Sequence, residues 1–446
     1  MKMKIIFLIL VSLYAGSCNH SNDLTTELER SSIQLPGTKP LEYTNSDLQP
    51  FLGNMNVGIV ALGEAAHGSS TIFELKHRLF KYLVEEADCR ALCYEFSFEK
   101  GLDINRFVLY GVGNIDSLLY DKYWIQSNKT IKEMLIWMKD YNAGRDISEK
   151  IHFIGIDNQL DMFNPSRLKY HYETFSDDLT EFVRPELDEL SGQGKPDYRN
   201  MEENYFSHIE GLIDTIGFKT RKFLIEQEHG ISKFEQKIIL HLIYSIKESH
   251  DFLYKAYNGG PNKRDIFLSD NVLWACSLFG VNEIIAVWAH NSHISSNPDY
   301  YGQGDGTMGY YLRNERKDKY LRIATSFNRG RIIAVEDDTV NGGDTSPHII
   351  EMDTIPVKGS VNELFDRLKY ENFILDLRKI EKESALYDYL DTIRPFLGIG
   401  DWFSGKFINN YSMDRMQNIM HDYDIIFHID SINPIILQGK WSEQPD

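Results

Sequence analysis

Short apolar runs, each long enough for one β-strand, alternate along the chain with longer segments of helical periodicity. The helical pattern is clear from Ile72 to Leu83, and again from Ile131 to Tyr141. The strand-length runs are continuously apolar, which is typical of strands buried on both faces of a parallel sheet. We therefore predict an α/β fold with a mostly parallel central sheet flanked by helices. The predicted strands are Val57–Leu62, Ala91–Phe96, Ile151–Ile156, Glu283–Ala289, Leu321–Phe327, Arg331–Val335, Phe373–Leu377 and Asp424–Ile429.

Residues 165–275 interrupt this alternation. They are rich in charged residues, carry apolar residues at helical spacing and contain almost no strand-length apolar run. We predict that this segment is a helical insertion that packs as a cap over the sheet. The domain as a whole is then expected to span residues 46–435, followed by a short tail at 436–446.

The first residues have the pattern of an export signal. Two lysines precede the apolar stretch Ile5–Leu13, which is too short to span a bilayer. Small residues then lead to Cys18, and this arrangement resembles a bacterial lipoprotein signal, in which the cysteine becomes the lipidated first residue. We expect a signal peptide at 1–17, a polar tether at 18–45 and a location at the cell envelope, facing the periplasm or the outer surface. A plain signal peptide and a simple N-terminal anchor are the alternatives.

The charge balance excludes several kinds of partner. The 446 residues include 47 lysines and arginines against 66 aspartates and glutamates, for a formal net charge of −19. A nucleic-acid binder or a polybasic membrane-surface protein would have the opposite sign. We therefore expect no nucleic-acid partner, and membrane contact only through the N-terminal lipid. Four cysteines are too few for a disulfide scaffold, and we predict that Cys89, Cys93 and Cys276 are buried thiols.

Polar residues with catalytic potential lie at the carboxyl ends of several predicted strands. In an open α/β sheet, ligands bind outside the carboxyl ends of the parallel strands, so residues at these ends converge on one edge. Two histidines three positions apart, together with a Glu-x-x-His motif at another strand end, favour a functional site over isolated loop residues. The converging residues are Glu64, His67, Glu95, Asp157, His290 and His293.

This set of side chains favours hydrolysis. A histidine oriented by a carboxylate takes a proton from water, and a second histidine or a cation stabilises the oxyanion that forms. Glu95 lies among aromatic residues and needs a cationic or histidine partner if it is buried. The sequence has no Gly-x-Ser-x-Gly elbow, no His-Glu-x-x-His motif and no phosphate-binding loop, which argues against serine esterases, zincin proteases and nucleotide-binding enzymes. The same donor atoms suit a divalent metal, so metal-assisted hydrolysis stays open.

Several motifs, specific in combination, resemble those of the erythromycin esterase family. The resemblance covers residues 45–435. The motifs are Leu62-Gly-Glu-Ala-Ala-His-Gly68, Phe73–Leu83, Ala91-Leu-Cys-Tyr-Glu95, Trp137-Met-Lys-Asp-Tyr-Asn142, Phe153-Ile-Gly-Ile-Asp157, Arg264-Asp265 with Asn271, Ala289-His-Asn-Ser-His293, and Tyr423-Asp424 with Ile429-Asp430 and Pro434.

The resemblance implies an enzyme that opens the lactone ester of macrolide antibiotics and so confers resistance to them. It implies attack by water, without a covalent serine. We expect no cofactor, with a divalent metal left open as above. At the matching positions, His67 is the expected general base, Glu64 lies beside it and Glu95 is the buried acidic partner. His290 and His293 are expected to complete the pocket.

Substrate contacts are expected from three further positions. A cationic residue follows the motif histidine in some members of the family, and here it corresponds to Lys76 or Arg78. The sequence does not decide which of the two faces the site. Asp157, at the end of its predicted strand, is the third expected substrate contact.

Two other functions are compatible with the sequence. The first is a metal-dependent hydrolase of another ester, with Glu64, His67, Glu95, His290 and His293 as ligands. The second is a non-catalytic surface lipoprotein that binds an apolar ligand in an aromatic cleft. The family also contains members labelled as polysaccharide-biosynthesis proteins, so the resemblance supports a hydrolase more firmly than it supports a macrolide substrate.

Overall fold

The computed structural model describes most of the chain that follows the expected signal peptide. Residues 1–23 lie outside the described residues, so export and lipidation at Cys18 stay predictions. No helix among the described residues is both long and apolar enough to cross a membrane. The described ranges are 24–43, 45–53, 55–120, 122–158, 164–261, 263–280, 283–299, 306–336, 346–352, 357–403 and 416–442.

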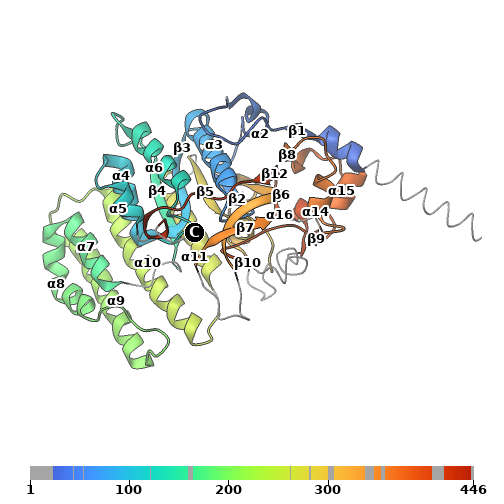
Figure 1. The fold of residues 1–446 in the computed structure, drawn as a ribbon. Helices are drawn as coiled ribbons and strands as arrows, with labels where there is room; N and C mark the ends of the chain where they lie inside the picture. Colours follow the sequence, from blue (N-terminus) through green and yellow to red (C-terminus); the bar gives the residue numbers. More distant parts are fainter. Residues whose placement is uncertain are drawn as a thin grey trace, which may run out of the picture.

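Ten strands of the described residues form one sheet at the centre of the molecule (Figure 1). In spatial order the main path is β1 (Ser32–Gln34), β8 (Asn372–Asp376), β12 (Ile425–Ile432), β6 (Tyr320–Glu336), β2 (Ile59–Glu64), β5 (Ile284–His290), β3 (Cys89–Ser97) and β4 (His152–Asp157). Neighbours from β12 to β4 are parallel, whereas β8 is antiparallel to both β12 and β1. Two further strands, β7 (His348–Met352) and β10 (Trp402–Phe403), pair with β6. Apart from this sheet, β9 (Arg394–Pro395) pairs with β11 (Met416–Gln417).

The mostly parallel α/β fold predicted from the sequence is confirmed, although the short strands β1, β7, β9, β10 and β11 were not predicted and two predicted strands are in fact one. The predicted strands Leu321–Phe327 and Arg331–Val335 belong to a single strand, β6, of 17 residues. β6 continues through Gly330 because it changes partners there. β12 pairs with β6 up to Gly330, and antiparallel β7 pairs with it from Gly330 onward.

Alternate residues of the central strands face opposite sides of the sheet, and each side has its own hydrophobic core. In β2, Ile59 and Ala61 belong to one core, whereas Val60 and Leu62 belong to the other. This two-sided burial explains why the strand sequences are continuously apolar. The Val60 side is covered by α2 (Gln49–Leu52), α3 (Ser70–Glu86), α5 (Ile115–Leu119) and α6 (Lys129–Asn142), and the Ile59 side by α11 (Arg264–Phe279), α12 (Asn291–Ile294), α13 (Met308–Arg316), α14 (Val361–Phe365), α15 (Ala385–Leu390) and α16 (Ile419–Asp422).

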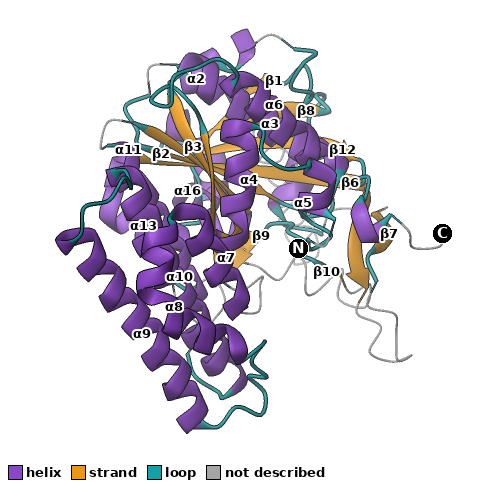
Figure 2. Ribbon diagram, turned by 90° about the vertical axis from the view of Figure 1, so that its left-hand side faces the viewer, coloured by secondary structure: helices purple, strands orange, loops and turns teal. Residues whose placement is uncertain are grey.

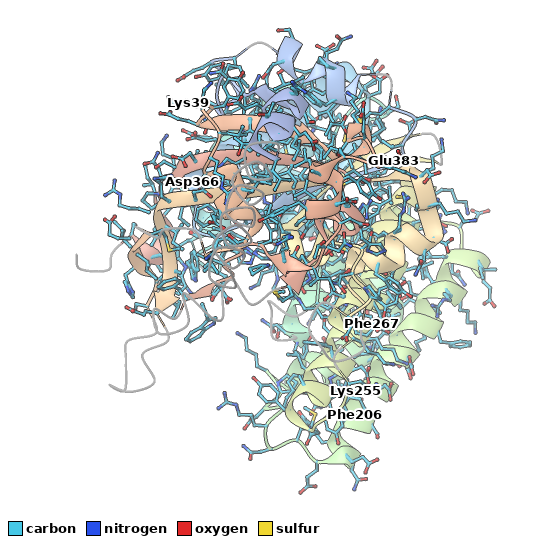
Figure 3. All side chains as sticks on the ribbon, turned by 90° about the vertical axis from the view of Figure 1, so that its right-hand side faces the viewer. Lys39, Phe206, Lys255, Phe267, Asp366 and Glu383 are labelled. Atoms are coloured by element: carbon cyan, nitrogen blue, oxygen red, sulfur yellow. The ribbon has the colours of Figure 1, made fainter. Side chains whose placement is uncertain are left out.

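Four helices between β4 and α11 form the predicted insertion, and they project from the sheet as a separate layer (Figure 2). They are α7 (Pro165–Phe175), α8 (Asp177–Gly192), α9 (Glu203–Glu226) and α10 (Lys233–Tyr257). Phe206 and Lys255 lie on this projecting layer, whereas Lys39 and Asp366 lie on the part that contains the sheet (Figure 3). The predicted range 165–275 extends too far, because α11 packs against β3, β4 and β5 and belongs to the sheet layers.

Both ends of the described chain pack against the domain, although a tether and a tail were expected there. Residues 24–31 are helical, and Leu24 and Leu28 are buried in the core because they lie on one face of this helix. β1 then adds an antiparallel edge to β8. Near the other end, the indole Nε1 of Trp441 donates to the backbone oxygen of Lys122 at 2.7 Å.

The three cysteines after the expected signal peptide are buried free thiols, as predicted. Burial raises the pKa of Cys276 to about 11 and the pKa of Cys89 to about 12. These thiols therefore stay protonated at neutral pH, and they lack the thiolate character that a nucleophile requires.

Close packing of β3, β4 and α4 (Phe98–Tyr110) depends on two glycines. A Cβ at Gly155 in β4 would lie 2.1 Å from the backbone oxygen of Ser97. A Cβ at Gly101 in α4 would lie 2.9 Å from the backbone nitrogen of Gly155. The helix and the two strands therefore approach one another more closely than any larger residue allows.

We expect Gly155→Ala to lower the free energy of unfolding by about 1–3 kcal/mol, because the backbone must move to admit the methyl group. Gly211→Ala in α9 is the matched control, since a Cβ there meets no atom within 4 Å. The control should raise stability by about 0.5–1 kcal/mol through helix propensity. Urea unfolding of the full-length variants, followed by circular dichroism, measures both changes. Equal stabilities of the two variants would contradict the packing argument.

Candidate active site

A cavity of about 210 Å³ lies at the carboxyl edge of the parallel strands β2, β3 and β5. The register of the strands creates this convergence, because Glu64 of β2 pairs with His290 of β5, and Tyr94 of β3 pairs with Trp288 of β5. The structure brings together on the cavity wall all five residues that were predicted to be catalytic. They are Glu64, His67, Glu95, His290 and His293.

Glu64 and His67 form the pair expected of an oriented base. Glu64 Oε1 accepts a hydrogen bond from Nδ1 of His67 at 2.6 Å. Because a carboxylate only accepts, the neutral ring carries its proton on Nδ1 and has its lone pair on Nε2. Burial alone would lower the pKa of His67, but the hydrogen bond and charge of Glu64, helped by Glu95 and Asp401, raise it above its ordinary value. His67 thus has the orientation and basicity of a proton acceptor.

Lys76 of α3 is the buried counter-ion of Glu64. Its ammonium donates to Oε2 of Glu64 and, at 3.2 Å, to the backbone oxygen of Ala289, and it lies 4.4 Å from the centre of the Trp288 ring. Burial lowers the pKa of Lys76 to about 8, although Glu64 opposes the shift. Burial alone would raise the pKa of Glu64, but Lys76 and His67 hold it below its ordinary value. Lys76 is fully buried behind Glu64, which does not suit the substrate contact that was expected.

Arg78, the other expected substrate contact, points away from the cavity. Its Nη1 donates to the backbone oxygen of Gly37 at 2.7 Å, and its Nη2 donates to Asp47. The two residues lie two positions apart on α3, so they are separated by about 200° around the helix. Of the two cations, Lys76 therefore faces the site, and Arg78 anchors the N-terminal segment.

The backbone that follows His67 is clamped between two segments distant in sequence. The backbone oxygen of Gly68 accepts hydrogen bonds from the N–H groups of Ile333 at 3.1 Å and Ile435 at 3.0 Å. A Cβ at Gly68 would lie 1.7 Å from the backbone oxygen of Ile333, so only glycine fits. This close approach determines where His67 lies relative to the strands.

Arg264, the first residue of α11, joins the acidic groups of the other half of the site. Its Nη2 donates to Glu95 at 2.7 Å and to Asp157 at 2.6 Å, and its Nε donates to Asp157 at 3.1 Å. The backbone N–H of His290 also donates to Glu95, at 3.0 Å. Glu95 therefore has the cationic partner that its burial was expected to require. Asp157 lies behind Arg264, about 1% exposed and away from the cavity wall, which does not suit the expected substrate contact.

The two histidines at the carboxyl end of β5, His290 as its last residue and His293 in α12, are held in different ways. His293 donates from Nδ1 to Asp265 at 2.8 Å, and its Nε2 accepts from Arg264 at 2.9 Å, because a guanidinium only donates. Both nitrogens of His293 are thus engaged within the protein. His290 accepts at Nδ1 from the backbone N–H of Ser292 at 3.2 Å, which places the proton of the neutral ring on Nε2. The ring centres of His290 and His67 are 4.9 Å apart, so a donor ring lies beside an acceptor ring.

Arg264, Tyr123 and Asp401 are among the residues of the cavity wall that were not predicted as site residues. In the sequence, Arg264 was recognised only as part of a family-like helix. Its position at the start of that helix could have indicated that it belongs to the site. Tyr123 and Asp401 carried no signal, because neither follows a predicted strand. In the structure the hydroxyl of Tyr123 donates to Asp401 Oδ2 at 3.0 Å.

The side chains do not fit the alternative of a divalent metal site. Among the described residues, no group of three or more His, Cys, Asp or Glu side chains is arranged to hold a metal ion. Two of the proposed ligands are carboxylates that already pair with cations, Glu64 with Lys76 and Glu95 with Arg264. The geometry therefore favours chemistry carried out by the side chains themselves.

Comparison with known proteins points to one family. A family model described as erythromycin esterase matches residues 84–432. The erythromycin esterase type II of Escherichia coli is 24% identical over 364 residues, which cover 75% of this chain and 84% of that protein. A putative hydrolase of Bacillus subtilis is 21% identical over 441 residues, which cover 90% of each protein.

Solved structures share the fold. A protein from Bacillus cereus superposes with a TM-score of 0.77 at 24% identity, over 94% of this chain and 99% of that one. A structure described as a succinoglycan biosynthesis protein superposes with a TM-score of 0.72 at 23% identity, over 94% of this chain and 98% of that one. A mutant of the erythromycin esterase EreC in its open conformation superposes with a TM-score of 0.65 at 16% identity, over 91% of this chain and 98% of that one.

The family match includes the elements that carry Glu95, Arg264, His290 and His293, and it begins after Glu64 and His67. The placement of Glu64 and His67 in the site therefore rests on the geometry described above. The match supports a hydrolase of the esterase kind. The family expected from the sequence motifs is thereby confirmed, and the chain belongs to the erythromycin esterase family.

Proposed function

We propose that this protein hydrolyses the lactone ester of macrolide antibiotics through a water molecule activated by His67. The observation that carries the proposal is the hydrogen bond from Nδ1 of His67 to Glu64, because it leaves Nε2 as the proton acceptor at the cavity. The esterase among the relatives supports the choice of substrate. Opening the lactone would inactivate the antibiotic and give resistance to it.

In the proposed reaction, Nε2 of His67 takes a proton from water while the water oxygen bonds to the ester carbonyl carbon. Glu64 stabilises the imidazolium that forms. Arg264 and the Nε2–H of His290, which both belong to the cavity wall, stabilise the negative charge on the carbonyl oxygen. As the intermediate collapses, the bond to the alcohol oxygen breaks and His67 returns its proton to that oxygen. The products are the carboxylic acid and the alcohol of the opened ring.

Lys76 supports this reaction through Glu64. Without a counter-ion, burial would favour the neutral form of Glu64. A neutral Glu64 would no longer raise the basicity of His67 or stabilise its imidazolium. Lys76 is therefore a positioning residue, and its ammonium keeps the carboxylate of Glu64 charged.

The size of the cavity limits which part of the substrate enters. A volume of about 210 Å³ is below the range of about 300–1,000 Å³ that is usual for sites of drug-sized ligands. The ester and the atoms next to it would occupy the cavity, and the rest of the macrolide would lie along its rim. Trp402, which directly follows Asp401 of the wall and is 51% exposed, offers an apolar surface for such contact.

We expect His67→Ala to lower kcat/KM for erythromycin by about 10²- to 10⁴-fold, the usual loss when a general base is removed. His348→Ala is the matched control, since that histidine has 47% of its side chain exposed and does not line the cavity. Mass spectrometry that detects the gain of one water measures turnover, and circular dichroism checks the fold. A near-wild-type rate for folded His67→Ala would disprove the assigned role, and no turnover by the wild type would disprove the macrolide substrate.

The pH dependence of hydrolysis follows from the raised pKa of His67. The base must be neutral, and Glu64 stabilises its protonated form, so His67 becomes neutral only above its ordinary pKa of about 6.5. We expect kcat/KM for an ester without a titratable group to rise with pH through a midpoint above 6.5. The profile between pH 5 and pH 9, measured on stable wild-type protein, checks this. A rate that is flat or falls between pH 6 and pH 8 would contradict it.

A further inference from the structure

Asp401 differs from the other carboxylates of the cavity wall in its partners. Glu64 is paired with Lys76, and Glu95 is paired with Arg264. Among the residues that the structure describes, the carboxylate of Asp401 forms no ion pair with a lysine, arginine or histidine, and its hydrogen-bond partner is the hydroxyl of Tyr123. Asp401 therefore presents an uncompensated negative charge to the cavity.

The position of Asp401 is determined by main-chain hydrogen bonds on two sides. Its backbone oxygen accepts from the N–H of Val335 in β6 at 2.9 Å. Two residues earlier, the N–H of Ile399 donates to the backbone oxygen of Ala65 at 2.7 Å, next to the loop that carries His67. Burial, and then the charge of Asp401, raise the pKa of Tyr123, so its hydroxyl stays protonated and donates to the carboxylate. The acid is thus preorganised at the cavity wall.

The other residues of the cavity wall are suited to a ligand with a positive charge, which would pair with Asp401. The wall has three carboxylates, those of Glu64, Glu95 and Asp401, while Arg264 on the wall and Lys76 behind it supply two positive charges. The aromatic rings of Tyr94, Tyr123 and Trp288 line the same space. A carboxylate together with aromatic rings is the combination that recognises alkylammonium groups in water-poor sites.

We propose that Asp401, held in place by Tyr123, binds a protonated amine of the substrate, so that the site selects esters carrying a cationic amine over neutral esters of the same shape. This inference rests on the proposed ester hydrolysis, and it adds the residue that determines specificity and the chemical group it recognises. The bound ammonium supplies the positive charge that the cavity lacks. The competing explanation is that Asp401 acts only through its charge on His67.

Binding of a matched pair of small probes tests the cation site without any turnover. Choline and 3,3-dimethylbutan-1-ol have the same shape and differ by one positive charge. Isothermal titration of the full chain should show that choline binds at least about tenfold more tightly to the wild type. This preference should fall below about threefold in Asp401→Asn, and it should persist in Asp318→Asn, the control with a 95% exposed side chain. Equal binding of the two probes by the wild type would overturn the proposal.

Turnover of the corresponding acetate esters separates binding of a cation from an effect on His67. The ratio of kcat/KM for the choline ester over its neutral isostere is measured at the pH where the wild-type rate reaches its plateau, so that the protonation of His67 does not differ between the two esters. We expect this ratio to fall about tenfold in Asp401→Asn and about threefold in Tyr123→Phe, which keeps the carboxylate but removes its hydrogen bond. An equal loss for both esters would overturn the proposal, because Asp401 would then act through His67 alone.

The two proposals fail in different ways. If the wild type hydrolyses no ester, the proposed function is wrong, and the choline titration still decides whether Asp401 binds a cation. If macrolides are hydrolysed but the wild type and Asp401→Asn show the same charge preference, the proposed function stands and the cation site is wrong. Should Asp401→Asn fail to fold, Tyr123→Phe gives the same readout, and an unchanged ratio in that variant would overturn the proposal.

Discussion

The partly buried guanidinium of Arg264 allows two adjacent parallel strands to carry carboxylates near their carboxyl ends. Glu95 of β3 and Asp157 of β4 would repel each other and lose hydration if no cation lay between them. Lys76 does the same for Glu64 in the other half of the site. Removing one partner of a buried ion pair typically costs about 3–5 kcal/mol. The acidic character of the site therefore depends on two cations that lie on helices, at the start of α11 and within α3.

The register of the sheet determines which side chains of the site lie next to one another. The parallel register pairs Glu64 with His290, so the acid that orients one histidine lies beside the other histidine. In β3 the pairing with β4 is irregular between Tyr94 and Ser97, and Glu95 lies within this bulge. A bulge redirects side chains, and it allows Glu95 to contact both Arg264 and the backbone N–H of His290. A strand of regular pleat would place successive side chains on opposite faces only.

Much of this arrangement could be predicted because it depends on local patterns. Continuous apolar runs predicted the parallel sheet, and the rule that ligands bind at the carboxyl ends of strands predicted the convergence of Glu64, His67, Glu95 and the two histidines. Strand β6 was predicted as two strands because Gly330 interrupts its apolar run. The strand continues because β7 replaces β12 as its partner at Gly330, and this exchange depends on residues distant in sequence. The prediction of a tether at 18–45 was wrong for residues 24–31, because Leu24 and Leu28 are enough to hold this short polar helix against the core.

Two features could not be predicted from the sequence. One is the direction in which a side chain points, and the other is contact between residues that lie far apart in the chain. Lys76 and Arg78 have similar chemistry and lie on one helix, so only packing decides that one meets Glu64 and the other meets Asp47. Asp157 has the sequence position of a ligand-binding residue, yet its carboxylate is fully used by Arg264. Tyr123 and Asp401 are 278 positions apart. No periodicity links them, and their contact becomes visible only once β6 and the segment before β10 are paired.

The site therefore has two parts with different structural origins. The groups suited to hydrolysis lie on the parallel strands, on the helices that pack directly on them and, for His67, on the short turn between β2 and α3, which main-chain hydrogen bonds hold in place. Tyr123 and Asp401 lie on connecting segments at the same cavity, and such segments change without disturbing the sheet. Solved structures described as an erythromycin esterase and as a succinoglycan biosynthesis protein share this fold. We therefore propose that the sheet and its helices keep His67 and the counter-ions in place, while the residues on connecting segments of the cavity wall determine which ester is bound.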